Sequence, residues 1–209
     1  MKTKTLVAAI GLILLVAQIL CAAQKEFGGG GIVYGDEHSF LIEAPTGWVL
    51  DNRTGVSQGL HAVFYPKGSS WSKAPAVMYA TTVNKKKEAV TTPQQLIAID
   101  LAKFKKTNPK IVMTEGRPLK TEDGKTALVR LFKGDQWGNI EGVAYIDEKA
   151  VVAILVLSSR NQAAFQEALP AFEKLVASYR FFTDDVRMPK KPQGGRDSAP
   201  EPKPQKPGI

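Results

Sequence analysis

The sequence predicts an α+β domain, and three observations point to it. Several short segments show the two-residue alternation of β-strands, bounded by turn-forming residues. Two other segments carry apolar residues at steps of three and four, the spacing of one helix face. The segments 139–146 and 150–157 are joined only by Asp147 to Lys149, so we expect them to form an antiparallel hairpin.

The first half of the domain is predicted to contribute strands separated by turns. Phe40 and Ile42 share one face of the first strand, and the turn at 45–47 leads directly into the second. Pro66 ends the third strand, and the fourth is rich in residues that favour β-structure. These expected strands span residues 39–44, 48–50, 60–65 and 76–83.

A helix is predicted after the fourth strand. Thr92 is a suitable N-cap, Pro93 fits the first helical position, and Gln95 is placed to complete a capping box. Pro109 disfavours helical geometry in Asn108, so the helix should stop there. Its apolar face is formed by Ile97, Leu101 and Phe104.

The second half returns to strand patterns. We expect the segment 125–132 to point Ala127, Val129 and Leu131 to one side. The segment 150–157 is almost wholly apolar, which predicts a central strand covered on both faces. The expected strands here span 111–114, 125–132, 139–146 and 150–157.

The last predicted element is helical. Ser159 and Gln162 are spaced as a capping box. Pro170 interrupts the pattern, so we expect a kink or a second helix beginning at that residue. The apolar stripe consists of Phe165, Leu169, Phe172, Val176 and Tyr179, which indicates core packing.

The N-terminus has the pattern of a cleavable secretory signal in residues 1–23. Lys2 and Lys4 precede an apolar run from Leu6 to Leu20, and the small residues 21–23 follow it. We expect cleavage after Ala23 and a periplasmic or secreted protein. The alternatives are an uncleaved membrane anchor and a lipoprotein acylated on Cys21, although Leu20 is a poor residue before a lipidated cysteine.

The remaining chain is expected to divide into three parts. Residues 24–37, with glycine at 28–31, are predicted to be a flexible spacer, residues 38–182 the folded domain, and residues 183–209 a disordered tail rich in proline and lysine. Cys21 is the only cysteine, so the processed chain would contain no disulfide.

Charge favours an anionic partner without identifying one. Removing Lys2 and Lys4 lowers the formal charge from +8 to +6. This moderate excess suits an acidic protein or an anionic envelope component, and we expect no contact with nucleic acid. No membrane-spanning segment is predicted after cleavage, and the protein is expected to be a monomer.

No motif of catalysis, metal binding or cofactor binding stands out. His38 and His61 are the only histidines, and each lies in or beside a predicted strand. Nucleophile-elbow, Walker and dinucleotide-binding patterns are absent from the sequence. We therefore predict no catalytic, metal-ligating or cofactor-binding residues, and no cofactor.

Two tryptophans in polar loops are the candidate partner-binding residues. Trp71 and Trp137 are large apolar side chains among polar neighbours, which is typical of binding anchors. Lys73 and Lys133 lie close to them in sequence and would attract an acidic partner. The alternative is that each indole folds back over the core as a lid.

Two phrases carry a family resemblance. Residues 40–48 (FLIEAPTGW) and 172–182 (FEKLVASYRFF), together with the order of elements, resemble the PsbP-like/Mog-type superfamily, whose bacterial branch includes DcrB-like secreted proteins. The resemblance spans residues 38–182 and implies an antiparallel sheet flanked by helices, an α/β/α sandwich. It also implies a non-enzymatic class of extrinsic photosystem subunits, assembly factors, a Ran-binding protein and envelope proteins.

These observations favour a non-catalytic binding or accessory module that contacts a protein or envelope component. One alternative is an envelope assembly factor whose basic tail grips an anionic surface. The other is an enzyme whose site is gathered from distant residues and leaves no local motif.

Overall fold

The computed structural model describes residues 29–35, 37–135 and 137–186. The strands are β1 (Gly30–Gly35), β2 (His38–Glu43), β3 (Trp48–Asp51), β4 (Ala62–Pro66), β5 (Ala76–Asn84), β6 (Val112–Glu115), β7 (Leu119–Lys120), β8 (Thr126–Lys133), β9 (Ile140–Asp147), β10 (Val151–Ser159) and β11 (Arg180–Thr183). The helices are the short 3-10 helix η1 (Val56–Gln58), α2 (Pro93–Thr107) and α3 (Gln162–Ala177).

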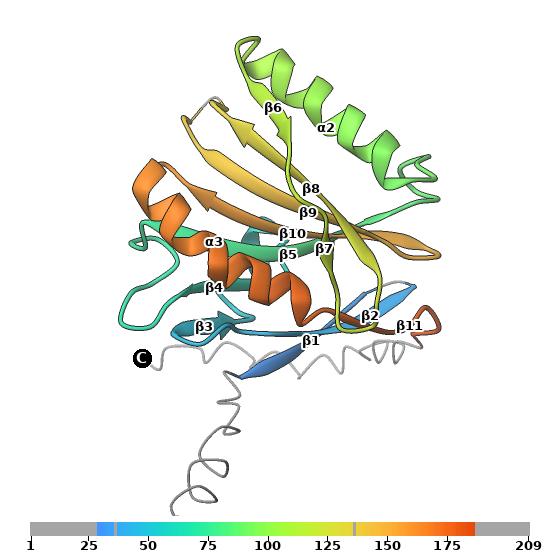
Figure 1. Cartoon of the computed structure of the whole chain (residues 1–209). Coiled ribbons are helices and arrows are strands. Elements are labelled where there is room, and N and C mark those ends of the chain that lie inside the picture. Colours follow the sequence, from blue (N-terminus) through green and yellow to red (C-terminus); the bar gives the residue numbers. More distant parts are fainter. Residues whose placement is uncertain (1–28, 36, 136, 187–209) are drawn as a thin grey trace, which may run out of the picture.

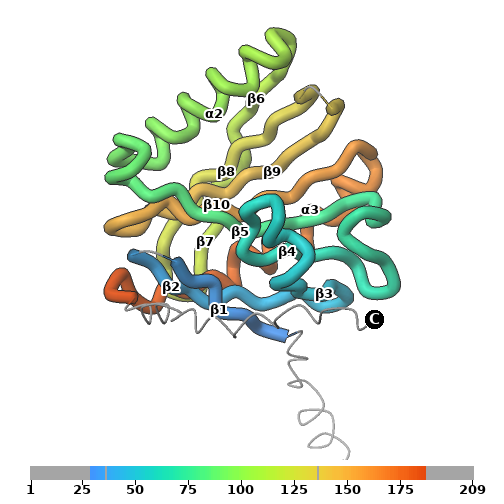
Figure 2. Tube along the Cα trace, turned by 180° about the vertical axis from the view of Figure 1, so that it is seen from behind, coloured from blue at the N-terminus to red at the C-terminus, as the bar shows by residue number. Residues whose placement is uncertain are grey.

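The strands form two antiparallel sheets. The large sheet has the order β3-β4-β5-β10-β9-β8-β6, with β7 paired to β8, and the small sheet has the order β1-β2-β11. Figure 1 shows α3 crossing the large sheet near β10 and β5, whereas α2 lies toward β6, β8 and β9. Seen from behind in Figure 2, the small sheet lies at the end of the molecule that also holds β3, far from α2.

Strand β10 separates two hydrophobic cores, as the apolar segment 150–157 predicted. Ala153, Leu155 and Leu157 point into the core shared with α3 and the small sheet. Their neighbours Val152, Ile154 and Val156 point into the core under α2. Both faces of β10 are therefore covered, and the α+β fold class with helices on the two faces of an antiparallel sheet is confirmed.

Helix α2 begins and ends where the sequence predicted. Thr92 Oγ1 accepts a hydrogen bond from the Gln95 amide at 3.3 Å, and Asn108 is the C-cap. The capping box is shifted by one residue, because Gln95 Oε1 accepts from the Thr91 amide, at 2.7 Å, rather than from Thr92. Leu96 and Ile97 are buried, and the predicted face packs on the sheet.

Helix α3 corrects two expectations. Its N-cap is Asn161, which accepts from the Ala164 amide at 3.0 Å, while Ser159 ends β10 and donates to the Pro75 carbonyl at 2.6 Å. The predicted second helix at Pro170 is wrong, because one helix continues through that residue. Proline has no N–H, so Pro170 leaves the backbone carbonyl of Gln166 without its helical donor. Both residues are exposed, so water can donate a hydrogen bond to this carbonyl.

The predicted spacer is wrong where the structure describes it. Residues Gly30–Gly35 form β1, which pairs along its whole length with β2 and buries Val33. At the other end of the domain, β11 extends to Thr183, one residue past the expected boundary. The predicted signal peptide and nearly all of the predicted tail lie outside the described residues. Among the described residues, no helix is long and apolar enough to cross a bilayer.

A buried polar group joins the small sheet to the large one. The Tyr179 hydroxyl donates to Glu148 Oε1 at 2.8 Å, and Lys125 pairs with the same carboxylate. Tyr179 lies between α3 and β11, and its ring packs against Phe40 of β2 with centroids 4.9 Å apart. Strand β2 pairs with β1. The contact between Tyr179 and Phe40 therefore also helps to fix the position of β1, which lines the groove described in the next subsection.

Candidate functional site

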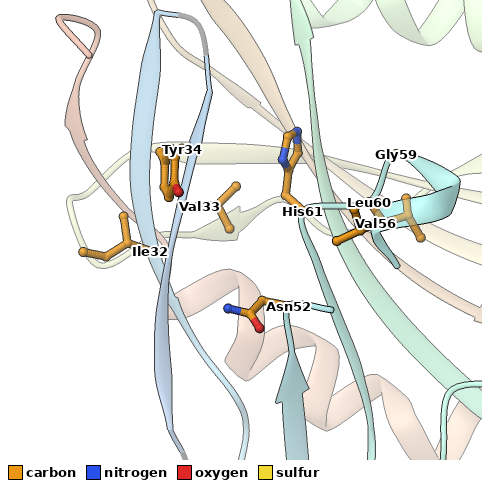
Figure 3. Close-up of a pocket in the computed structure, with 8 residues that line it drawn as sticks. All are labelled: Ile32, Val33, Tyr34, Asn52, Val56, Gly59, Leu60 and His61. Atoms are coloured by element: carbon orange, nitrogen blue, oxygen red, sulfur yellow. The ribbon is translucent and has the colours of Figure 1, made fainter. Parts of the chain in front are cut away.

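A groove lies between β1 and the segment that joins β3 to β4. Its cavity has a volume of about 350 Å³. Ile32, Val33 and Tyr34 of β1 line one side of the cavity, and Val56 and Leu60 line it from the β3–β4 segment. In Figure 3 the Val33 side chain points toward His61, whereas Ile32 points to the opposite side of β1. We call this cavity the β1 groove; none of the residues that line it carries a carboxylate, an ammonium or a guanidinium group.

The segment that forms the second wall is held by hydrogen bonds to Asp51. Asp51 accepts hydrogen bonds from the amides of Arg53 and Thr54, at 2.8 and 3.0 Å, and from the Thr54 hydroxyl at 2.6 Å. The bond from the Thr54 hydroxyl is the main reason why the pKa of Asp51 falls to about 2. Gly55 is required here, because a Cβ on it would lie 2.6 Å from Val63 Cγ1.

Large apolar side chains around the β1 groove are exposed to solvent. Ile32 is 57% exposed, Tyr34 54% and Val56 64%. Isolated exposed apolar residues are ordinary on protein surfaces, but these three gather around one cavity from two segments of the chain. This grouping is the profile of an interaction surface.

A second cavity, of about 440 Å³, shares His61 with the β1 groove. His38 is buried at its wall, and the ring centroids of His38 and His61 are 6.0 Å apart. Thr82 Oγ1 lies 3.4 Å from His38 Nε2, and Glu88 also lines the cavity. An imidazole pair beside a hydroxyl can exchange protons with a ligand or donate hydrogen bonds to it.

Gly35 makes room for the buried histidine. A Cβ at this position would lie 2.5 Å from His38 Cε1, so any larger residue would displace the ring. Among the described residues no group of three histidine, cysteine, aspartate or glutamate side chains is arranged to hold a metal ion.

The predicted tryptophan loops lie elsewhere, at one end of the large sheet. The register aligns Ala76 with Ser159, Ser159 with Ile140, and Ile140 with Lys133, so the loops before β5 and before β9 emerge at the same end. Lys133 and Lys73 are exposed there.

The two indoles differ in their environment. Trp71 is half-buried, and its ring meets Tyr79 edge-on with centroids 6.3 Å apart, as a lid would. Trp137 is 61% exposed, and its amide donates to Asp135 at 2.9 Å. Partner binding by Trp71, Trp137, Lys73 and Lys133 stays a prediction.

The residues of the β1 groove were missed by sequence reasoning. Ile32 and Tyr34 follow a glycine run, which hid a strand whose outward residues are apolar. The run of three β-branched or aromatic residues, Ile32, Val33 and Tyr34, was the signal that could have revealed it. Val56 gave no signal in the sequence, because it lines the groove only when the fold brings its segment next to β1.

Comparisons with known proteins find similar folds at low identity. No protein-family model matches the chain, and no curated protein matches it. One similar solved structure is cyanobacterial PsbP from Synechocystis sp. PCC 6803, with 14% identity and a TM-score of 0.45, covering 77% of this chain and 97% of that one. Another is the Ran-binding protein Mog1p of Saccharomyces cerevisiae, with 12% identity and a TM-score of 0.44, covering 73% and 94%. The DcrB-like branch stays a prediction.

Proposed function

We propose that this chain is a secreted or periplasmic binding module without catalytic activity, which holds a protein or envelope component at the β1 groove. The observation that carries the proposal is the gathering of Ile32, Tyr34 and Val56, all more than half exposed, around one cavity. Covering apolar surface of this kind is favourable for association, because it removes apolar area from water.

The proposal is tested by placing a charge in the β1 groove. Val56→Asp should reduce capture of partners from envelope extracts by about tenfold or more, because a carboxylate would be desolvated there without a partner. Since Val56 is 64% exposed, the variant should melt like the wild type. The measurement is quantitative mass spectrometry of proteins and lipids retained by the immobilised chain.

The matched control is Val112→Asp on β6. Val112 is 56% exposed on an edge strand of the large sheet, so this variant adds the same charge to a different surface. Equal losses with both variants would contradict a role for the β1 groove.

Trp137→Ala in the same assay tests the tryptophan loops, and a chain truncated after Val186 tests the alternative that the basic tail binds an anionic surface.

Secretion has its own test. The N-terminal pattern predicts that the processed protein begins at Gln24 and is recovered outside the cytoplasm. N-terminal sequencing of protein from fractionated cells measures this directly. Protein that begins at Met1, or that carries a lipid on Cys21, would contradict cleavage after Ala23.

An enzyme is the alternative that a specific observation favours. His38, His61, Thr82 and Glu88 line one cavity, and such a set can support acid–base chemistry. Against it, the Thr82–His38 distance of 3.4 Å is long for an activated nucleophile. Turnover of chromogenic esters or phosphates that disappears in His61→Ala would overturn the non-catalytic proposal.

A further inference from the structure

We propose that the outer edge of β1 accepts an extended segment of a partner polypeptide as an added strand. The proposal deepens the binding role proposed for the β1 groove and rests on it. It specifies that recognition uses the backbone of the partner as well as its side chains.

Among the described strands, none pairs with the outer edge of β1. In the described part of the chain β1 pairs only with β2, at the end of the small sheet. The Ala44 amide donates to the Gly29 carbonyl, at 3.3 Å, immediately before β1. Because hydrogen-bonded pairs alternate in an antiparallel ladder, Gly31, Val33 and Gly35 bond to β2. The N–H and C=O groups of Gly30, Ile32 and Tyr34 therefore point to the outer edge.

Strand β1 lacks the features that block edge pairing. Natural edge strands are shortened, charged or interrupted by proline, because an open edge recruits other chains. The sequence of β1, Gly-Gly-Ile-Val-Tyr-Gly, has six residues, no charge and no proline. Every other edge strand of the described sheets carries a charged residue: Asp51 in β3, Glu115 in β6, Lys120 in β7 and Arg180 in β11.

The surroundings of this edge indicate what occupies it. Val56 and Leu60 lie across the groove from β1, so an added strand would have a wall on its far side (Figure 3). A single extended segment fits that arrangement, whereas a second copy of the chain would bring its own β2 against the wall. No aspartate, glutamate, lysine or arginine lines the cavity, so the partner side chains that enter it should be uncharged and largely apolar.

The tail of this chain does not fit the same edge. Residues 187–209 contain prolines at 189, 192, 200, 202, 204 and 207, and proline has no N–H to donate to a strand. The tail also carries several lysines, which a cavity without acidic side chains would desolvate. We therefore assign the edge to another polypeptide that presents alternating apolar residues without proline.

The experiment uses the chain without residues 1–23 and a defined probe. The probe is a fluorescein-labelled, end-capped seven-residue peptide that alternates valine with threonine, and fluorescence anisotropy measures its affinity. Ile32→Pro removes one outward N–H while leaving the predicted bonds between β1 and β2 intact. It should weaken binding by about tenfold or more, and by much more than Ile32→Val, which keeps both the N–H and an apolar β-branched side chain.

Peptide variants provide a readout that does not depend on the folding of the protein variant. N-methylation of alternate residues blocks the N–H groups on one edge of the peptide. Methylation of one set should abolish binding, and methylation of the other set should spare it. Equal affinity for both methylated peptides, or unchanged affinity of a folded Ile32→Pro chain, would overturn the proposal.

Two further outcomes separate this proposal from its rivals. Loss of partner capture in Val56→Asp but not in Ile32→Pro would overturn the added strand while leaving the binding role of the β1 groove in place. Sedimentation of the free chain as a dimer that Ile32→Pro dissolves would assign the edge to a second copy, and would overturn the proposed occupant.

Discussion

Replacing Tyr179 by alanine is expected to lower the free energy of unfolding by about 4 kcal/mol. The side chain is fully buried, packs against Phe40 and belongs to the core beneath α3. Its removal leaves a cavity and deprives the buried Glu148 carboxylate of the Tyr179 donor. Urea denaturation followed by tryptophan fluorescence measures the change.

Two further variants divide this loss into its parts. Tyr179→Phe keeps the ring and removes only the bond to Glu148, which should cost about 1–3 kcal/mol. Tyr34→Ala removes the same type of side chain where it is 54% exposed, and should change stability by about 0.5 kcal/mol or less. A Tyr179→Ala chain as stable as Tyr34→Ala would show that the small sheet is not held to the domain through Tyr179.

The consequence extends to the β1 groove. Tyr179 contacts Phe40 in β2, and β2 is the one strand that pairs with β1 in the described structure. Weakening the contact between Tyr179 and Phe40 should therefore allow β1 to shift relative to Val56. Binding of the alternating peptide to Tyr179→Phe would report whether that wall must be fixed.

Local periodicity explains which parts of the fold were predictable. The face of α2 and the central position of β10 follow from residues that are near one another in the sequence, such as Ile97 with Leu101. The hairpin between β9 and β10 follows from the short link at Asp147–Lys149. Elements of this kind leave their signal within a single window of sequence.

The small sheet was less predictable because its strands depend on distant partners. Glycine residues weaken the strand signal of β1, and its pairing with β2 compensates for the unfavourable entropy of ordering glycine. Strand β11 follows directly on α3, so Tyr179 appeared to continue a helical stripe, although it lies beyond the helix end at Ala177.

The candidate site was missed for the same reason. The β1 groove exists only when β1 and the segment containing Val56 are brought together by the fold. The sequence instead drew attention to tryptophan, whose large apolar surface stands out in any polar loop. A packed indole such as Trp71 and an exposed one such as Trp137 have the same appearance in sequence.

A partly buried glutamate on β9, Glu141, leads to the second prediction. Burial is the main cause that raises the pKa of Glu141 from its ordinary value of 4.5 to about 7, and nearby Asp135 and Asp100 add to the rise. A hydrogen bond with Ser158 acts in the opposite direction. Between pH 4.5 and 7 the folded protein therefore holds a proton that the unfolded chain releases. The contribution of Glu141 to the free energy of unfolding therefore falls as the pH rises from 4.5 to 7, and it is constant at higher pH.

Glu141→Gln should remove this pH dependence. Near pH 4.5 the wild-type side chain is neutral in the folded state, so the variant should differ little in stability there. At pH 8 the variant should be more stable by up to about 3 kcal/mol, because it no longer places an ionised carboxylate in a desolvated position. Urea denaturation at pH 5, 6, 7 and 8 gives the difference curve, and Glu167→Gln on the exposed face of α3 controls for the change in net charge. A flat difference curve for Glu141→Gln would mean that water reaches the Glu141 carboxylate between α2 and the sheet.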